Sequence, residues 1–398
     1  MKKLKILALD SEGGHGGSSR SLFTTLKNLN KNSIELCVIC KKESWIKSAY
    51  QKQGIKCLIF KNIPTFTCVP KISRNIYNLF KFIIFLWPKS YYFRLELKKI
   101  SKNFSIIHFN HINQFLIAIW LKKNNPKIKI SIHIRTTPKE SIFSKLQYKI
   151  VYKNFKNLVF ITENEYHHFK KLSGAHKLKK NIIFNSVESN SYRKNKYAYI
   201  KNKNKNKLIL GSISNYSYFR GTDRIMQILA ILPKNILSEI HVVIAGDIKI
   251  SRTTKKILNL SKDVTCLKSY AKSLGLQNNF TFLGHINDPD NLIIHLNLII
   301  KLTRENNPWG RDIIESMYYG IPVLSIGTYD FFIKNNISGI LLSHYNKNII
   351  AKIISKFIKN PTLLEEMGIE AKKEIYTHCN AKKNSKTIKA FWKKCKKF

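Results

Sequence analysis

The sequence predicts an α/β protein with two doubly wound parallel sheets that face a central cleft. Short apolar runs alternate with longer helical stretches in residues 1–188, and a second series of this kind occupies residues 208–380. Strands separated by helices are typical of βαβ units, whose crossovers make a sheet parallel. The Lys- and Asn-rich residues 189–207 are predicted to be a linker, and residues 381–398 a closing basic helix.

The order of the expected elements supports this division. The first series has predicted strands at 4–10, 34–40, 56–60, 105–109, 128–134, 158–161 and 181–185, with a helix at 19–30. The second has predicted strands at 208–213, 239–245, 280–283, 296–302 and 323–326, with helices at 222–232, 263–274, 311–319 and 349–359. Ligands of doubly wound sheets bind beyond the carboxyl ends of the strands. The candidate site residues are therefore those that follow the strands.

Composition limits the classes of protein that fit. The 398 residues include 70 Lys and Arg against 23 Asp and Glu, for a net charge of +47, and 44% are hydrophobic. That apolar fraction excludes a largely disordered chain. The charge favours polyanions such as nucleic acid. Lys, Asn and Ile share A/T-rich codons, however, and no nucleic-acid-binding motif is present, so we expect no nucleic-acid partner and keep that function only as a minor alternative.

The apolar segments and cysteines indicate a cytoplasmic protein. No apolar run reaches the eighteen residues of a membrane span, and the amino terminus lacks the apolar core and cleavage site of a signal peptide. Seven cysteines, an odd number, favour reduced thiols, and the Cys37–Cys40 pair fits a buried strand better than a zinc site. Residues 76–87 are apolar, aromatic and flanked by basic residues. They fit either a buried core helix or an interfacial helix, and the flanking charge favours the membrane-facing alternative.

A glycine-rich loop at residues 11–20 follows the first predicted strand. Such a loop lets backbone N–H groups approach an anion at a helix N-terminus. The dinucleotide fingerprint fails at Ser19, and no acidic residue follows the second strand where a ribose would need one. The loop is thus predicted to contact a phosphate or an acceptor sugar, with a plain tight turn as the alternative. Its candidate residues are Gly16, Gly17, Ser18 and Arg20.

Residues 304–324 form the most informative motif in the sequence. A loop leads to a helix start marked by Pro and Gly, and a short helix is followed by Gly-Ile-Pro and a buried strand. Glu315 falls about one turn into that helix, where a carboxylate can accept hydrogen bonds from the two vicinal hydroxyls of a ribose. Free N–H groups near Gly310 and Arg311 suit a sugar or a diphosphate. An exposed helical acid is the alternative for Glu315.

Residues 307–324 resemble the nucleotide-sugar site of family 4 glycosyltransferases, which are retaining enzymes of the GT-B fold with two Rossmann-like domains. The family signature is Glu, seven residues, Glu, then Gly-x-Pro-Val. The resemblance implies that Glu315 binds the nucleotide ribose. Asn307 stands where the first glutamate contacts the donor sugar, so a charge is lost at that position.

The resemblance extends over most of the chain. Arg220 and Gly221 match the loop in which a lysine usually clamps the donor diphosphate, and Asn215 replaces an expected arginine. The resemblance also implies that Gly284 and His285 lie beside the base. It makes residues 1–188 the acceptor domain and 208–380 the donor domain, and it implies that the last helix crosses back onto the first domain.

The acceptor domain offers two alternatives for one catalytic position. The family places a histidine near the reacting sugar at the end of the strand that contains His133 and Arg135, and which of the two takes that place stays open. His108, Asn110 and His111 end the preceding strand and are further candidates. A structural role is an equal alternative for each histidine.

The resemblance implies a retaining glycosyltransferase that uses a nucleotide-diphosphate sugar. Residues 288–290, Asp-Pro-Asp, match a metal motif of another glycosyltransferase fold, but the proline favours a turn, so we expect no metal and no cofactor. Residues 1–200 hold 38 Lys and Arg against 9 Asp and Glu. This excess favours an anionic membrane surface and a glycolipid or polysaccharide acceptor, as in lipopolysaccharide synthesis, at the cytoplasmic membrane face. An epimerase or a sugar phosphorylase of the same fold remains an alternative.

Overall fold

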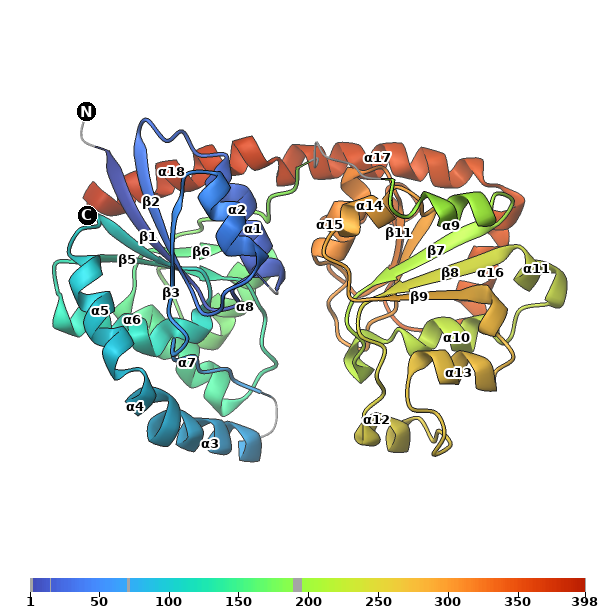
Figure 1. The fold of residues 1–398 in the computed structure, drawn as a ribbon, viewed down its shortest axis with the longest axis horizontal. Helices are drawn as coiled ribbons and strands as arrows, with labels where there is room; N and C mark the ends of the chain where they lie inside the picture. The colour runs from blue at the N-terminus through green and yellow to red at the C-terminus, as the bar shows by residue number, and fades with distance from the viewer. Residues whose placement is uncertain (1–2, 15, 70–71, 189–194, 398) are drawn as a thin grey trace. The chain divides into compact units, whose positions relative to one another are not determined.

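The computed structural model describes residues 3–14, 16–69, 72–188 and 195–397. Contacts divide the chain into two compact units, residues 1–186 with 379–398 and residues 187–378. Each unit contains one six-stranded sheet flanked by helices (Figure 1). All the strand pairs within both sheets are parallel, so the predicted fold class of two doubly wound α/β sheets is confirmed.

The sheet of the N-terminal unit has the order β3-β2-β1-β4-β5-β6. Its strands are β1 (Leu4–Asp10), β2 (Ile34–Cys40), β3 (Lys56–Ile59), β4 (Ile106–Phe109), β5 (Lys129–Ile134) and β6 (Leu158–Phe160). The predicted strand at 181–185 is wrong, because Ile182 makes only an isolated bridge to Phe160. Strand order reverses between β1 and β4, so the ligand-binding end of this sheet is the edge where these two strands finish.

Two apolar cores cover the two faces of this sheet. Leu7 and Leu9 of β1 point into one core and Ile6 and Ala8 into the other, as the alternation of a strand requires. Cys37 and Cys40 are buried in β2, which confirms the predicted strand. The helices are α1 (Gly17–Lys27), α2 (Trp45–Lys52), α3 (Ile72–Lys81), the π-helix η1 (Phe82–Leu86), α4 (Trp87–Lys89), α5 (Tyr91–Ser101), η2 (Ile112–Gln114), α6 (Phe115–Asn124), α7 (Ile142–Asn154), α8 (Glu163–Ser173) and α18 (Ala381–Lys397).

The sheet of the C-terminal unit has the order β12-β11-β10-β7-β8-β9 and reverses between β7 and β10. Its strands are β7 (Leu208–Ile213), β8 (Ile240–Ala245), β9 (Phe280–Gly284), β10 (Leu298–Lys301), β11 (Val323–Ile326) and β12 (Gly339–Leu342). Its helices are α9 (Ala198–Lys203), η3 (Tyr218–Arg220), α10 (Asp223–Leu229), α11 (Lys234–Ser238), α12 (Arg252–Ile257), α13 (Leu267–Ser273), η4 (Gln277–Asn279), α14 (Pro289–Ile293), α15 (Arg311–Tyr318), α16 (Lys347–Lys359) and α17 (Thr362–Cys379).

Several of these elements differ from the sequence-based expectation. β12 and α17 were not predicted, and α9 lies inside the stretch expected to be a linker. Residues 189–194 of that stretch lie outside the described part of the chain. The Asp-Pro-Asp segment is the start of α14 rather than a turn, because Pro289 occupies the first helical position, where its missing N–H costs nothing.

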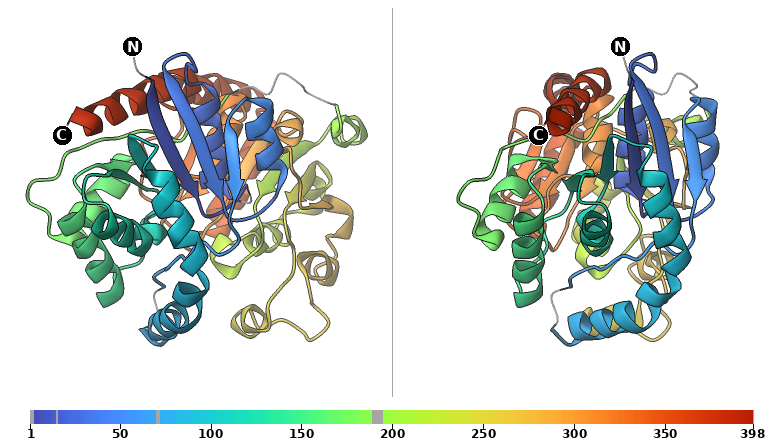
Figure 2. Two further views of the ribbon diagram at one scale, coloured as in Figure 1. Left: turned by 60° about the vertical axis from the view of Figure 1, so that its left-hand side comes forward. Right: turned by 90° about the vertical axis from the view of Figure 1, so that its left-hand side faces the viewer.

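The apolar segment around residues 76–87 is not a core helix. α3 and η1 run through it from Ile72 to Leu86, and most of their large apolar side chains are exposed. Both further views of the ribbon place α3 beyond the carboxyl ends of the N-terminal strands (Figure 2). No helix in the described ranges combines the length and hydropathy needed to cross a bilayer.

The final helix, α18, belongs to the N-terminal unit. Ser385 Oγ donates to the Thr25 carbonyl at 2.7 Å, and Asn384 Nδ2 donates to the Phe184 carbonyl at 3.1 Å. Trp392 is fully buried and lies edge-on to His108, with ring centres 5.3 Å apart. This indole fills the core between α18 and the sheet.

Replacing Trp392 by Ala is expected to lower the free energy of unfolding by about 3–5 kcal/mol, because it removes a fully buried indole and leaves a cavity. Urea unfolding followed by circular dichroism measures this loss. Tyr376→Ala on the exposed face of α17 is the control and should change stability by less than about 0.5 kcal/mol. Equal effects of the two changes would show that α18 does not depend on this side chain.

Candidate functional site

A buried ion pair joins the two loops at the switch point of the C-terminal sheet. Arg304, in the loop after β10, donates to both carboxylate oxygens of Asp223, at 2.9 and 2.5 Å. Asp223 is fully buried at the start of α10, and Tyr216 Oη donates to it at 3.2 Å. The Arg304 guanidinium also stacks on the ring of Tyr218 at 4.1 Å. The loop after β7 is therefore held against the loop after β10 at the end of the sheet where a ligand is expected.

Gly221 allows these two loops to approach. Its φ of 71° is left-handed, and a Cβ atom there would lie 1.9 Å from the Leu302 carbonyl oxygen. Only glycine meets both conditions. The preceding residue, Arg220, ends η3 with an exposed side chain and interacts electrostatically with Lys301 on the neighbouring strand. The structure thus brings the predicted phosphate-binding arginine to the switch point.

The start of α15 lies at the same edge of the sheet. Gly310 is the N-cap residue of α15 and, having no side chain, makes no side-chain hydrogen bond to the N–H groups of the first turn. Arg311 donates from Nε and Nη2 to Glu315 Oε1, at 2.8 and 2.5 Å, and Glu315 is buried. The predicted ribose-binding carboxylate is therefore not an exposed helical acid. Its orientation is set by the arginine one turn before it.

Lys301 is a site residue that the sequence analysis missed. It ends β10, is only 6% exposed, and donates to the Trp309 carbonyl at 2.9 Å and to Asp312 Oδ1 at 3.2 Å. Burial lowers the pKa of Lys301, and Asp312 partly opposes that shift. A Cβ atom on Gly310 would lie 2.9 Å from Lys301 Nζ, so this cation sits directly under the start of α15. The sequence feature that could have identified Lys301 is a single lysine in an otherwise apolar predicted strand.

The remaining predicted donor residues are Asn307, Gly284 and His285. Asn307 is exposed in the loop before α15, and the next-door Asn306 fixes that loop by hydrogen bonds to Thr328, at 2.7 and 2.8 Å. Gly284 ends β9, where its carbonyl accepts from Gly246 N–H at 2.7 Å, and His285 follows it with an exposed side chain. β9 is two strands from β7, which is about 10 Å across the sheet.

In the N-terminal unit, Arg135 is the centre of a buried hydrogen-bond network. Its Nε donates to the carbonyl and to Oδ1 of Asn110, both at 3.0 Å, and Nη1 donates to Asn185 Oδ1 at 2.7 Å. Asn110 in turn donates to the Ser18 carbonyl at 3.2 Å. The network connects the ends of β4 and β5 with the glycine-rich loop. Arg135 therefore fixes the shape of this edge of the sheet.

His133 and His108 lie on the sheet face that α18 covers. His133 Nδ1 accepts from Arg135 at 3.0 Å, and His108 Nδ1 lies 2.9 Å from Ser131 Oγ. Burial lowers the pKa of both, to about 3 for His108, with Arg135 as a further cause. Both rings are neutral in the folded protein and enclosed by packing. This packing favours the structural alternative for both histidines.

Two less buried side chains lie at the carboxyl edge of this sheet. His111 is partly exposed after β4, and burial lowers its pKa to about 4, against the opposing effect of Glu12. Glu12 accepts a hydrogen bond from Ser18 Oγ at 2.5 Å, and a Cβ on Gly16 would collide with its carboxylate. A carboxylate thus already occupies the start of α1, which Gly16 and Gly17 open. This arrangement disfavours a phosphate there and favours a hydroxyl donor such as a sugar.

Arg20, the fourth residue predicted in this loop, lies within α1, and its N–H donates to the Gly16 carbonyl at 3.3 Å. This bond closes the first turn of α1 beside Glu12. Among the described residues, no group of three or more His, Cys, Asp or Glu side chains is placed to hold a metal ion.

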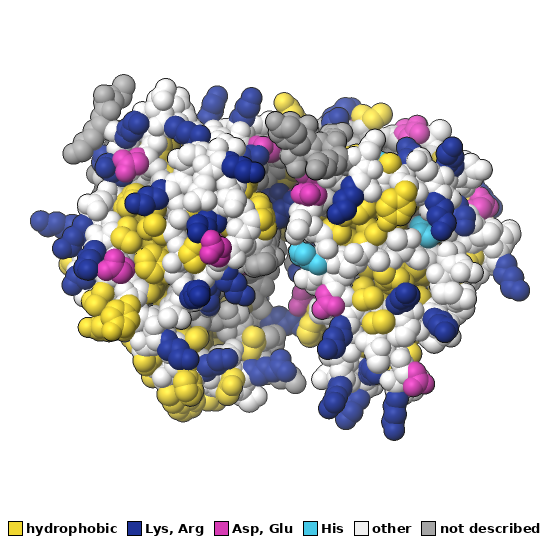
Figure 3. Space-filling view, viewed as in Figure 1, with side chains coloured by type: hydrophobic (Ala, Val, Ile, Leu, Met, Phe, Trp, Pro, Cys, Tyr) yellow, Lys and Arg dark blue, Asp and Glu magenta, His cyan; other side chains and the backbone are white. Residues whose placement is uncertain are grey.

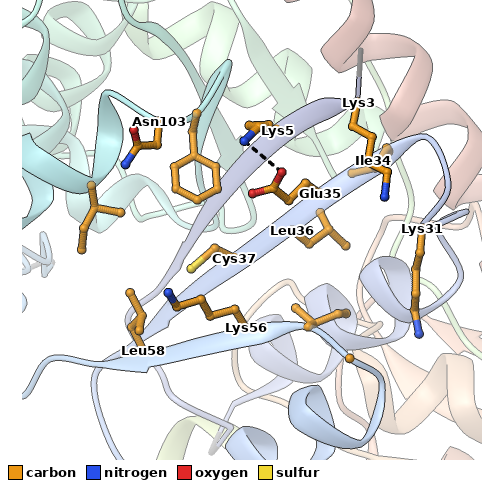
Figure 4. Close-up of a pocket in the computed structure, with 14 residues that line it drawn as sticks. Lys3, Lys5, Lys31, Ile34, Glu35, Leu36, Cys37, Lys56, Leu58 and Asn103 are labelled. Carbon is orange, nitrogen blue, oxygen red and sulfur yellow. Dashed lines mark ion pairs between the residues drawn. The ribbon is translucent and has the colours of Figure 1, made fainter. Parts of the chain in front are cut away.

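A hollow of about 590 Å³ lies elsewhere in the N-terminal unit (Figure 4). Lys3, Lys5 and Lys56 line it, and Lys5 pairs with Glu35 at 3.1 Å. These residues lie at or near the amino ends of β1 to β3, opposite the edge where doubly wound sheets bind ligands. The hollow is therefore not part of the candidate site.

Comparisons with known proteins agree with this geometry. Residues 193–374 match the family described as glycosyl transferases group 1. Anabaena Alr3699/HepE in complex with UDP-glucose is 17% identical, with a TM-score of 0.76 over 98% of this chain and 100% of that one. A glycosyltransferase from Rickettsia africae is 18% identical, with a TM-score of 0.72 and 99% of each chain covered. No curated protein matches the chain. These similarities show that the chain has the GT-B fold.

A structure of the lipopolysaccharide outer core galactosyltransferase WaaB is also similar. It is 14% identical, with a TM-score of 0.63 over 98% of this chain and 99% of that one.

Arg304→Ala is expected to lower the free energy of unfolding by about 3–5 kcal/mol, because it leaves the Asp223 carboxylate buried without its cation. Urea unfolding measures the loss. Lys373→Ala breaks the exposed pair with Glu370 and should cost no more than about 1 kcal/mol. A similar small cost at Arg304 would contradict its assigned role.

Stability is expected to fall as the pH drops from 7 to 5. The unfolded chain protonates His108 below pH 6.5, while the folded protein keeps it neutral down to about 3. The unfolded state therefore binds more protons in this window, and His108 alone should contribute a loss of about 2 kcal/mol by pH 5. The difference in the free energy of unfolding between pH 7 and pH 5 should be smaller in His108→Asn than in wild type. The exposed His344→Asn is the control, and an unchanged difference in His108→Asn would refute the assignment.

Proposed function

We propose that the protein is a retaining glycosyltransferase of the family 4 type, which transfers a sugar from a nucleoside-diphosphate sugar. The observation that carries the proposal is the buried Glu315 carboxylate on α15, which Arg311 orients one turn after the N-cap residue Gly310. The group 1 match of residues 193–374 supports it. The UDP-glucose bound to the Anabaena neighbour supports a donor of this chemistry.

Each part of the donor has a matching group in the C-terminal unit. Glu315 accepts hydrogen bonds from the ribose hydroxyls, and Arg220 with the α15 N–H groups stabilises the diphosphate. Asn307 and Gly310 orient the sugar, while Gly284 and His285 lie beside the base. Lys301 holds the Trp309 carbonyl and Asp312, and so fixes the start of α15.

The chemistry follows from where charge develops. The bond between the anomeric carbon and the diphosphate oxygen breaks, and a bond to the acceptor oxygen forms on the same face of the sugar. The leaving phosphate takes the acceptor proton, so no protein base and no metal ion is required. Arg220 and the helix N–H groups stabilise the negative charge on the leaving diphosphate.

The acceptor meets the N-terminal unit at the edge that contains Glu12 and His111. Glu12 accepts hydrogen bonds from acceptor hydroxyls, and Arg135 positions the loops around them. We propose a glycolipid or surface polysaccharide acceptor, such as lipopolysaccharide, at the cytoplasmic face of an anionic membrane. The excess of 38 Lys and Arg over 9 Asp and Glu in residues 1–200 supports this location. The WaaB neighbour supports the acceptor class.

Thermal-shift measurements with a panel of UDP-, GDP-, ADP- and CMP-sugars test the donor. A ligand that binds only the folded state raises Tm, and one nucleotide class is expected to do so. Glu315→Gln removes the charge that accepts the ribose hydrogen bonds. It should weaken donor binding, seen as a smaller Tm shift, and slow transfer, each by about 100-fold. This is the effect expected for the loss of about 3 kcal/mol of charged hydrogen bonding.

Glu370→Gln, a half-exposed acid on α17, is the matched control and should behave as wild type. Wild-type ligand response in Glu315→Gln would refute the site. The anomeric configuration of the transferred sugar, read by NMR, tests retention, and an inverted product would exclude it.

A further inference from the structure

The helix formed by α3 and η1 presents a long apolar stripe to solvent. Its members are Ile72, Ile76, Leu79, Phe80 and Ile83, spaced at three, four and seven residues so that they share one face of a helix. They are between 37% and 60% exposed. Ile84 and Phe85 widen the stripe where the helix takes π geometry, a feature common at functional sites.

Side chains on one face attach this helix to the rest of the unit. Asn75 is buried and bonds both the N–H and the carbonyl of Val69. Phe82 is buried against Phe66 and Trp87, at ring distances of 6.1 and 5.6 Å. Asn75 and Phe82 are seven residues apart and define the inner face. Leu79 lies between these two residues at the border of the inner face, but every member of the stripe is exposed, so the protein has not used these side chains to build its core.

Basic residues accompany the stripe. Arg74 and Lys81 lie on α3 itself, and Lys89, Lys98 and Lys99 follow on α4 and α5. Glu96 is the one acidic side chain between Ile72 and Ser101. Figure 3 shows yellow side chains gathered over α3 and α4, with dark blue ones beside them. An apolar stripe flanked by cations matches a bilayer with anionic headgroups. A second copy of the chain would bring like charges together.

The stripe is connected to the candidate acceptor loops. Phe66 N–H donates to the Asn113 carbonyl at 2.8 Å, and Asn113 N–H donates to His111 Nδ1 at 3.1 Å. Phe66 packs on Phe82 at the root of the stripe. Phe66 therefore contacts the exposed helix on one side and, through Asn113, the candidate acceptor edge on the other. A surface that receives the stripe lies next to the loops that would receive the acceptor.

We propose that α3 and η1 are the element by which the N-terminal unit docks on an anionic lipid bilayer. The helix lies in the plane of the headgroups with Ile76, Phe80 and Ile83 in the acyl boundary. The docking proposal deepens the proposed function and rests on it, because a docked helix would present a lipid-borne acceptor beside His111. It specifies the surface, its orientation and the lipid charge.

Vesicle flotation of the full chain tests the docking. The wild type should float with vesicles that are one third phosphatidylglycerol, and added salt or pure phosphatidylcholine should weaken its binding. The variant Ile76→Glu/Phe80→Glu/Ile83→Glu should bind at least about tenfold more weakly, because three charges cannot enter the acyl boundary. The matched control, Ile337→Glu/Ile349→Glu/Ile369→Glu, changes three exposed isoleucines of the other unit by the same charge and should float as wild type.

Two further measurements keep the outcomes separate. Circular dichroism and Tm confirm that both variants are folded. The nucleotide-sugar thermal shift is measured without lipid, and it should be unchanged in the stripe variant. If neither the wild type nor either triple variant shows a nucleotide-sugar thermal shift, the donor proposal is refuted and the docking result stands. Equal flotation of the two triple variants would overturn the docking surface. A wild-type dimer that the stripe variant dissociates would also overturn it and would make a second copy the occupant.

Discussion

The bidentate ion pair between Arg304 and Asp223 is the interaction on which the candidate donor site depends. It fixes the loop after β7 to the loop after β10, the two strands between which the sheet order reverses. Arg220 and Gly221 belong to the first loop, and the second leads into α15. Because a buried charge pair tolerates little displacement, the position of Arg220 and the position of the α15 start are coupled.

The start of α15 concentrates charge in a small volume. Lys301 lies under Gly310 and is held by Asp312, while Arg311 holds Glu315 one turn further on. A cation near a helix N-terminus is unfavourable unless an anion accompanies it. Asp312 supplies part of that compensation in the protein. A bound diphosphate would supply more, which agrees with the proposed donor and with the exposed Arg220 nearby.

The N-terminal unit uses its polar groups differently. Arg135, Asn110 and Asn185 form a buried network that shapes the edge of the sheet, and the α18-covered histidines complete its packing. His111 is partly exposed at that edge, and the stripe of α3 and η1 is exposed to solvent. The unit therefore combines the proposed acceptor edge with an exposed apolar helix. This is the arrangement expected of an enzyme whose acceptor is held in a membrane.

The sequence by itself determined the fold class and most of the strand positions, and it located the motif of the proposed donor site, because periodicity and Gly-Pro punctuation are local properties of the chain. It left the Arg304–Asp223 pair, the buried Lys301 and the choice between His133 and Arg135 open. Those depend on which side chains distant in sequence meet. Only the tertiary structure decided that His133 is covered by α18 and that the apolar helix at 72–86 is exposed. An amphipathic pattern is the same whether its apolar face meets a core or a membrane, and only packing distinguishes the two.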